Sequence, residues 1–245
     1  MKKTLISMAI SIAALLPTLS HAALTAEQQQ QLDSIHQLLT ENPEIIGDLQ
    51  LSLQQYVEGQ KQLENAKKQS ESWLNDTTIH TVLGNTDGST VIVNFTDYNC
   101  PYCKRLDGEL TKLVANYKDL KVINIYVPLK QQVIEGLDTN SAAFAIKVWQ
   151  QAPEKFVEVN RLLVAKPGIH TKDSIEAIAK KTDTTQYLTG DTKINESLVK
   201  NYKTFVALGL RGTPAMFIGD ELIPGYVPYD KLEQVIKKNM AENAS

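Results

Sequence analysis

Apolar side chains recur at alternating steps of three and four residues through residues 24–72, a segment otherwise rich in Gln and Glu. Such steps place the side chains along one narrow face of a helix, as in helices that pair with one another. Asn42-Pro43 interrupts the pattern, because proline removes a helix hydrogen bond and clashes with the preceding turn. We therefore predict a helix over 25–41 and a second over 43–72, with Pro43 in its first turn.

This apolar stripe can be covered in two ways. It can pair with further copies of the chain, or it can pack against the chain's own globular part. We favour self-association through residues 24–72, because a two-helix arm before a complete domain has little else to cover its apolar face. The stripe mixes Leu, Ile and Tyr in both alternating positions, so it is compatible with a dimer and with a trimer. Its members are Leu32, Ile35, Leu39, Ile46, Leu49, Leu53, Tyr56 and Leu63.

From residue 78 the pattern changes to short β-branched runs separated by helical spacing. Val82-Leu83 and residues 89–95 are predicted strands around an Asp87-Gly88 turn. Helical spacing follows over 104–117, and a further β-branched run spans 120–127. The order strand, helix, strand predicts a right-handed βαβ unit with a parallel pair of strands.

The rest of the chain predicts a block of helices and then a return to strands. Capping residues and prolines predict helices from Asn140 or Ser141 to Gln151, from Pro153, over 173–180, over 194–208 and over 228–240, with Gly209 ending the fourth. Predicted strands cover 215–218 and 222–223 around a Gly219-Asp220 turn. The fold class is therefore α/β. We divide the chain into a helical arm over 23–75 and a domain over 76–245, with a helical insertion over about 130–208.

The N-terminus predicts export. Lys2 and Lys3 precede an apolar run over residues 5–16, and the small-residue segment Ser20-His21-Ala22 follows. This is the pattern of a secretory signal peptide over residues 1–22, cleaved after Ala22, and the run is too short for a stable membrane anchor. The formal charge is −3 before cleavage, and removal of the two lysines makes the mature chain more acidic. No basic stripe is present, so we expect no nucleic-acid partner.

The chain contains two cysteines, in the segment Cys100-Pro101-Tyr102-Cys103 directly after the second predicted strand. A disulfide that closes a two-residue loop stabilises a fold little, so the pair is better suited to redox exchange than to a structural role. Cys100 begins a predicted helix, where unpaired N–H groups and the helix dipole favour a thiolate. Pro101 suits the first helical position, and Cys103 lies one turn deeper as the resolving thiol.

A metal site is not expected. Zinc normally takes four ligands, and beside the cysteines the mature chain offers only His36, His80 and His170, which are far apart in sequence. We predict no metal and no cofactor.

Three segments resemble the DsbA family of exported thiol-disulfide oxidoreductases. Residues 95–104 (FTDYNCPYCK) resemble its active-site segment, residues 209–215 (GLRGTPA) its cis-proline loop, and residues 222–225 (LIPG) the turn before its last helix. The resemblance implies a thioredoxin fold with a helical insertion, a periplasmic location, cysteine-containing protein substrates and a membrane redox partner of DsbB or DsbD type. The arm is similar in pattern to the oligomerising arms of ScsC-type proteins.

The resemblance also implies site residues beyond the cysteines. It implies a cis peptide at Thr213-Pro214, facing the cysteine pair, where the backbone of Thr213 pairs with an extended substrate strand. Many catalysts of this fold carry a buried acid six residues before the first cysteine, where this chain has Asn94. Another group or water must therefore remove the proton of Cys103. Asp97 is the nearest acid in sequence, and we treat it as a possible assisting residue.

Three functional hypotheses follow. The first is an oligomeric disulfide isomerase or reductase whose pair is held reduced, a hypothesis that Thr213 favours because isomerases of this fold often carry Thr before the cis proline. The second is a dithiol oxidase of DsbA type that donates disulfides. The third is a non-enzymatic copper-binding or chaperone-like protein. The site chemistry favours the first two, and the sequence leaves the direction of electron flow open.

Overall fold

The structure, a computed structural model, describes residues 24–243. The predicted signal peptide, residues 1–22, lies outside the described residues. The contacts of the chain form two compact units, the first ending at Val57 and the second beginning at Glu58. The boundary falls inside a helix, α2 (Ile46–Leu74), and not at residue 75, where the sequence pattern changes. The predicted arm from Glu58 onward thus belongs with the second unit.

The first unit holds the helices predicted around Asn42-Pro43. Helix α1 (Ala26–Glu41) begins at a capping box between Thr25 and Gln28, and the short helix η1 (Pro43–Ile45) leads into α2. Helix α1 ends because Asn42 turns out of helical geometry and donates from its side chain to the Leu38 carbonyl oxygen at 2.9 Å. The predicted break at Pro43 is confirmed.

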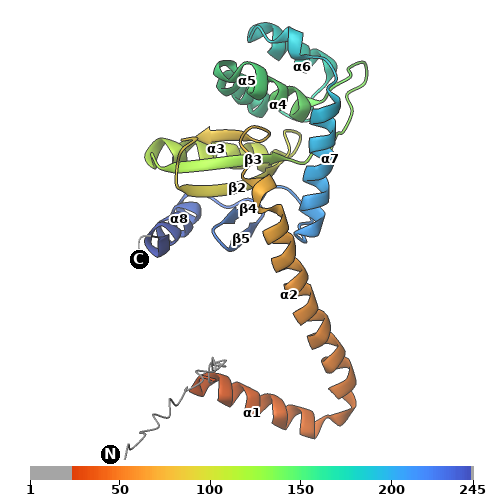
Figure 1. The fold of residues 1–245 in the computed structure, drawn as a ribbon, viewed down its shortest axis with the longest axis vertical. Helices are drawn as coiled ribbons and strands as arrows, with labels where there is room; N and C mark the ends of the chain where they lie inside the picture. Colours follow the sequence, from red (N-terminus) through yellow and green to blue (C-terminus); the bar gives the residue numbers. More distant parts are fainter. Residues whose placement is uncertain (1–23, 244–245) are drawn as a thin grey trace, which may run out of the picture. The chain divides into compact units, whose positions relative to one another are not determined.

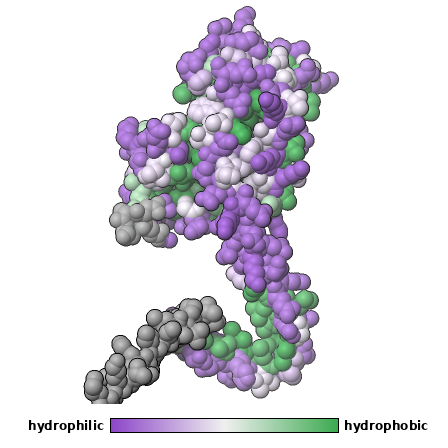
Figure 2. Space-filling view, in the orientation of Figure 1, coloured by the Kyte–Doolittle hydropathy of each residue, from purple (hydrophilic) through white to green (hydrophobic). Residues whose placement is uncertain are grey.

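Large apolar side chains of this unit are exposed. Figure 2 shows them gathered around the turn between α1 and α2. The exposed members are Leu24, Leu32, Ile35, Leu38, Ile45, Ile46, Leu51, Leu53, Tyr56 and Val57. Exposed apolar surface of this extent is a feature of protein–protein contact sites.

The second unit is built on a five-stranded sheet in the order β1-β3-β2-β4-β5. The strands are β1 (Thr81–Gly84), β2 (Thr90–Thr96), β3 (Leu120–Tyr126), β4 (Ala215–Ile218) and β5 (Glu221–Pro224). Helix α3 (Pro101–Asn116) joins β2 to β3, which are parallel, so the predicted βαβ unit is confirmed. Strand β1 pairs antiparallel with β3, although the Asp87-Gly88 turn connects it to β2.

Alternation along β2 divides the core between the two faces of the sheet. Ile92 faces a cluster with Leu106 and Leu110 of α3 and with Leu232 of helix α8 (Tyr229–Asn243). Phe95 faces the opposite cluster, formed with α7 (Thr192–Ala207) and the last turns of α2. Burial of a side chain of this size contributes about 1.5–3 kcal/mol, so both faces stabilise the sheet that carries the cysteines.

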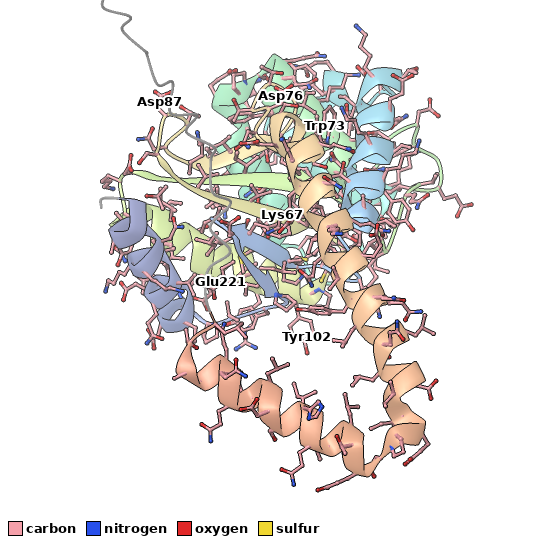
Figure 3. All side chains as sticks on the ribbon, turned by 60° about the horizontal axis from the view of Figure 1, so that its bottom comes forward. Lys67, Trp73, Asp76, Asp87, Tyr102 and Glu221 are labelled. Carbon is pink, nitrogen blue, oxygen red and sulfur yellow. The ribbon has the colours of Figure 1, made fainter. Side chains whose placement is uncertain are left out.

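The end of the predicted stripe packs on the cluster that contains Phe95. Leu63 and Trp73 of α2 lie against the cluster that contains Phe95, and Trp73 donates its indole N–H to Asn201 of α7 at 3.0 Å. Figure 3 shows Lys67 and Trp73 along the part of α2 that borders the domain. Leu39, Leu49 and Leu63 of the predicted stripe are half-buried and not exposed. The structure corrects the stripe at its end, because Leu63 contacts the domain where its helical turn lies beside the sheet.

Four helices lie between β3 and β4, where the helical insertion was predicted. They are α4 (Ser141–Gln151), α5 (Pro153–Ala165), α6 (Lys172–Lys181) and α7, with the short helix η2 (Thr185–Tyr187). Asn140 caps α4, and Gly209, at φ +70°, follows the end of α7 as predicted. Figure 1 shows α4, α5 and α6 grouped beyond one side of the sheet, with α7 returning past it. The α/β fold with a helical insertion is confirmed.

Within residues 24–243, no helix is both long enough and apolar enough to cross a membrane.

Candidate active site

The two cysteines lie at the beginning of α3, immediately after β2. Cys100 is the N-cap residue, in extended geometry, and Pro101 takes the first helical position. The Cys100 carbonyl oxygen accepts the first helical hydrogen bond, from Lys104 N–H at 3.1 Å. Both thiols are free, and the residues are 5% and 3% exposed for Cys100 and Cys103. The strand-to-helix turn thus presents two sulfurs at one helix N-terminus.

The two thiols have opposite electrostatic environments. The side-chain hydrogen bond from Cys103 lowers the pKa of Cys100 to about 6, and the backbone N–H groups of Cys103 and Tyr102 act in the same direction. Burial raises the pKa of Cys103, and its hydrogen bond to Cys100 raises it further. Near neutral pH, Cys100 is therefore a thiolate and Cys103 a thiol that donates to it.

The cis-proline loop lies directly beside Cys100. The Thr213-Pro214 peptide is cis, as the resemblance implied. The Cys100 thiol lies 3.3 Å from the Thr213 carbonyl oxygen, so a loop more than a hundred residues away in sequence borders the reactive sulfur. Gly225, at φ +98°, donates its backbone N–H to the Pro214 carbonyl oxygen at 2.9 Å and holds the loop from the other side.

Asp97 and Asn99 hold the segment that enters the helix. Asp97 is buried, and its carboxylate accepts from the backbone N–H of Asn99 at 2.8 Å and from that of Lys130 at 3.0 Å. Asn99 accepts from the His170 N–H at 2.8 Å. Burial raises the pKa of Asp97, while the two backbone donors favour its charged form. The Asp97 carboxylate thus binds backbone N–H groups of the loops around the cysteines.

The charged residues that follow Cys103 are held by the fold. Lys104 donates to the carbonyl oxygens of Lys166 and Gly168 after α5, and burial lowers its pKa. Arg105 stacks on the ring of Tyr226 at 4.4 Å. Tyr102 is 60% exposed and lies at the surface of the domain (Figure 3). Tyr102 is therefore open to a macromolecular partner.

A small cavity of about 10 Å³ lies behind Cys103. Its walls include Asp107 of α3, Asn124 of β3 and Asn160 of α5. Asn94 does not line it, but donates to Asn124 at 2.8 Å. A larger groove of about 580 Å³, between residues 127–140 and α7, includes neither cysteine.

Sequence reasoning missed Asp107. The residue lies four positions after Cys103, and this helical spacing was the available signal, because side chains four apart share one face of a helix. The search for an acid was directed to the strand, where Asn94 stands, and to Asp97, the nearest acid before the cysteines.

The profile of the family described as Thioredoxin matches residues 74–238, which include the cysteines, the cis proline and the whole sheet. The chain belongs to the thioredoxin family. Among curated proteins, this thioredoxin-family chain is 22% identical over 171 residues to disulfide bond formation protein D of Bacillus subtilis. That alignment covers 65% of this chain and 76% of the Bacillus protein.

Solved structures place the chain more closely within the thioredoxin family. A linker-deletion mutant of Proteus mirabilis ScsC is 31% identical, with a TM-score of 0.69, and the match covers 91% of this chain and 100% of that one. A periplasmic thioredoxin-like protein of Salmonella enterica serovar Typhimurium is 39% identical, with a TM-score of 0.62, over 69% of this chain and 94% of that one. This thioredoxin-family protein is a thiol-disulfide oxidoreductase of the DsbA and ScsC type.

Proposed function

We propose that this protein is an exported, oligomeric disulfide isomerase or reductase, in which Cys100 attacks a substrate disulfide and Cys103 resolves the mixed disulfide. The observation that carries the proposed exchange chemistry is the unequal pair of cysteines at the N-terminus of α3. The pKa of Cys100 is lowered to about 6, whereas burial raises that of Cys103. The thiolate is the nucleophilic form, so the two sulfurs have separate roles.

The cis-proline loop is the proposed substrate-binding element. The Thr213 carbonyl oxygen lies 3.3 Å from Cys100 Sγ, so an extended substrate strand that pairs with the backbone of Thr213 brings its cysteine to the reactive sulfur. Pro214 lacks an N–H group and leaves the Thr213 backbone as the pairing edge. Recognition through backbone atoms tolerates different sequences, which suits cysteine-containing proteins as a substrate class.

Oligomerisation is proposed to occur through the exposed face of residues 24–57. It is supported by Ile35, Leu53 and the other exposed apolar residues of α1 and the first turns of α2. Several active sites around a shared space suit an isomerase, because a misfolded substrate can be released by one site and captured by the next. Export to the periplasm, with cleavage after Ala22, is supported by the N-terminal pattern and by a relative described as periplasmic.

The proposal is tested by two measurements on the full mature chain. Thiol trapping in cells reports the redox state of Cys100 and Cys103, and refolding of a substrate with scrambled disulfides reports isomerase activity. We expect a mainly reduced pair, kept so by a membrane partner of DsbD type, and recovery of native substrate. A mainly oxidised pair without isomerase activity contradicts the proposal. Cys100→Ser is the matched control, and disulfide exchange that survives it removes Cys100 as the nucleophile.

The second candidate is a dithiol oxidase re-oxidised by a partner of DsbB type. The low pKa of Cys100 favours it, because a stabilised thiolate stabilises the reduced protein and makes its disulfide a stronger oxidant. The same relative from Bacillus subtilis is named for disulfide bond formation. An oxidised pair in cells, together with oxidation of a reduced substrate, supports this candidate over the isomerase.

A further inference from the structure

We propose that Asp107 accepts the proton of Cys103 when the mixed disulfide is resolved, in place of the strand acid that Asn94 replaces. The inference rests on the proposed exchange chemistry and assigns the residue that allows its second step. It applies to the isomerase and the oxidase alike, because the same proton returns to Cys103 when the enzyme disulfide opens.

The first observation is the shared cavity. Cys103 and Asp107 line the same space of about 10 Å³, which has room for about one water molecule. The two residues are four apart on α3, a spacing that puts their Cβ atoms roughly 5–6 Å apart on one face of the helix. A single bridging water is the natural link between a thiol and a carboxylate at that separation.

The second observation is that the other titratable side chains around the cavity are already held by hydrogen bonds. The two carboxylate oxygens of Asp97 each accept a backbone N–H, at 2.8 and 3.0 Å. Lys104 is held by carbonyl oxygens after α5. The hydroxyl of Tyr98 donates to Asn160 at 2.6 Å and lies 2.6 Å from that of Tyr126. These four complete the titratable side chains of the cavity wall beside Cys103 and Asp107.

Asp107 is held far less tightly. Its carboxylate lies 3.5 Å from the Asn160 amide nitrogen, the outer limit of a hydrogen bond. The pKa of Asp107 is raised to about 6 by burial, with the Asn160 contact opposing the shift. The carboxylate is therefore ionised at neutral pH, and its affinity for a proton exceeds that of an ordinary aspartate.

The resolving step transfers one proton and two electrons. In the mixed disulfide, Cys100 Sγ is bonded to a substrate sulfur. The proton of the Cys103 thiol passes through the bridging water to Asp107, and the Cys103 sulfur attacks Cys100 Sγ. The Cys100–Cys103 bond forms, the Cys100–substrate bond breaks, and the substrate sulfur leaves as a thiolate. Two electrons pass from the enzyme dithiol to the substrate disulfide.

The test separates the two steps on the reduced mature protein with an aromatic disulfide that releases a coloured thiolate twice. Attack by Cys100 releases the first equivalent, and resolution by Cys103 releases the second. In Asp107→Asn we expect a first phase within about 2-fold of wild type and a second phase slower by on the order of 100-fold, the contribution typical of a general base. A second phase slowed by less than about 10-fold overturns the assignment to Asp107.

Two further variants distinguish proton transfer from a structural effect. Asn124→Asp places a carboxylate on the same cavity wall and keeps the acceptor for Asn94. In the Asp107→Asn background it is expected to recover at least about 10-fold of the second phase. Asp87→Asn, at an exposed turn outside the site, is the matched control and is expected to leave that phase within about 3-fold. A loss confined to Asp97→Asn assigns the proton to Asp97 and overturns the proposal.

The pH profile of the wild-type second phase is an independent readout. With Asp107 as acceptor, the rate reaches a plateau above about pH 6, where the carboxylate is ionised. Without an acceptor, the rate rises about 10-fold per pH unit through the same range, because the Cys103 thiolate must form by itself. Failure of the proposed exchange chemistry gives a different result from failure of the Asp107 assignment. In that case wild type shows no first phase, and Cys103→Ser does not remove the second phase.

Discussion

At the residue scale, two cysteines separated by two positions differ in chemistry because one caps the helix and the other points into the protein. Cys100 receives hydrogen bonds from Cys103 and from backbone N–H groups, which stabilise its negative charge. Cys103 is surrounded by protein, so burial raises its pKa, and its hydrogen bond to Cys100 raises it further. One helical turn is thus enough to give the two thiols opposite pKa shifts.

The lowered pKa of Cys100 can be measured directly by titrating the thiol. Thiolate absorbance in the ultraviolet, followed on the reduced protein, should rise with a midpoint near pH 6. Cys103→Ala removes the largest stabilising contact, so its midpoint should lie at higher pH. Cys100→Ser is the control and should lack the transition. An unchanged midpoint in Cys103→Ala contradicts the hydrogen bond as the main cause.

Asp107 gives a stability prediction whose sign follows from its pKa. The folded value is raised from 3.8 to about 6, so the folded protein holds this proton more tightly than the unfolded chain. Stability therefore falls as pH rises from about 4 to about 6 and stays lower above it. Asp107→Asn should be more stable at pH 7 by roughly 2 kcal/mol, since solvent screens part of the full shift at this half-buried site.

Urea unfolding of the reduced protein at pH 7 and at pH 4 checks this value. The gain should disappear at the lower pH, where wild type is protonated. Asp87→Asn, at an exposed turn, is the control and should change stability little at either pH. A variant that is less stable than wild type at pH 7 means that the carboxylate stabilises the fold.

At the element scale, α2 belongs to two environments. Its first turns expose apolar side chains, whereas its last turns pack Leu63 and Trp73 on the core of the domain. Trp73 also lies edge-on to His80 at 5.1 Å and under the Lys200 ammonium at 3.8 Å. These contacts make the end of α2 part of the domain and leave residues 24–57 as the segment available for pairing.

Charges placed on that segment should disrupt self-association. Ile35 and Leu53 are 47% and 55% exposed, so glutamate at both positions adds no buried charge to the isolated chain but puts charges into a paired interface. The double variant Ile35→Glu/Leu53→Glu should lower the mass per particle measured by light scattering. Gln54→Glu, exposed on the same helix, is the control. An oligomer of unchanged mass in the double variant excludes this face as the contact.

At the scale of the whole molecule, the thioredoxin-type domain carries the cysteine pair, and the proposed role of the arm is to link several such domains. Exchange at one active site needs only the cysteine pair and the cis-proline loop, which the sheet and α3 bring together. Isomerisation requires repeated capture of the same substrate, which several linked sites favour through their high local concentration. Loss of the arm contacts should therefore affect isomerisation more than exchange.

The variant Ile35→Glu/Leu53→Glu tests this division of roles. Its exchange with a small disulfide should stay within about 2-fold of wild type, whereas recovery of scrambled substrate should fall by at least about 5-fold, because linked sites no longer act together. In cells its pair should become more oxidised, since a monomer is open to an oxidising membrane partner. Equal loss of both activities indicates damage to the domain, and loss of neither contradicts a role for the arm.

Local pattern was sufficient for the elements, and it is the basis of the proposed cysteine roles. Pro43, Pro153 and Gly209 mark helix boundaries through restrictions on their own backbone, which is why the predicted ends lie close to the observed ones. Cys100 and Cys103 are three positions apart at a strand-to-helix junction. This position at a helix N-terminus predicts a stabilised thiolate at Cys100. The cis peptide at Thr213-Pro214 followed from the family resemblance and is present.

Packing between distant segments decided the rest. Strand β1 pairs with β3 because neighbouring strands in a sheet need not be neighbours in sequence. Leu63 packs on the domain, unlike the exposed residues of the stripe, because the sheet lies beside its turn of α2. Asp107 became a candidate only when β3 and α5 closed a cavity around it and Cys103. Sequence period specifies which face of a helix a residue occupies, and the tertiary fold determines what that face meets.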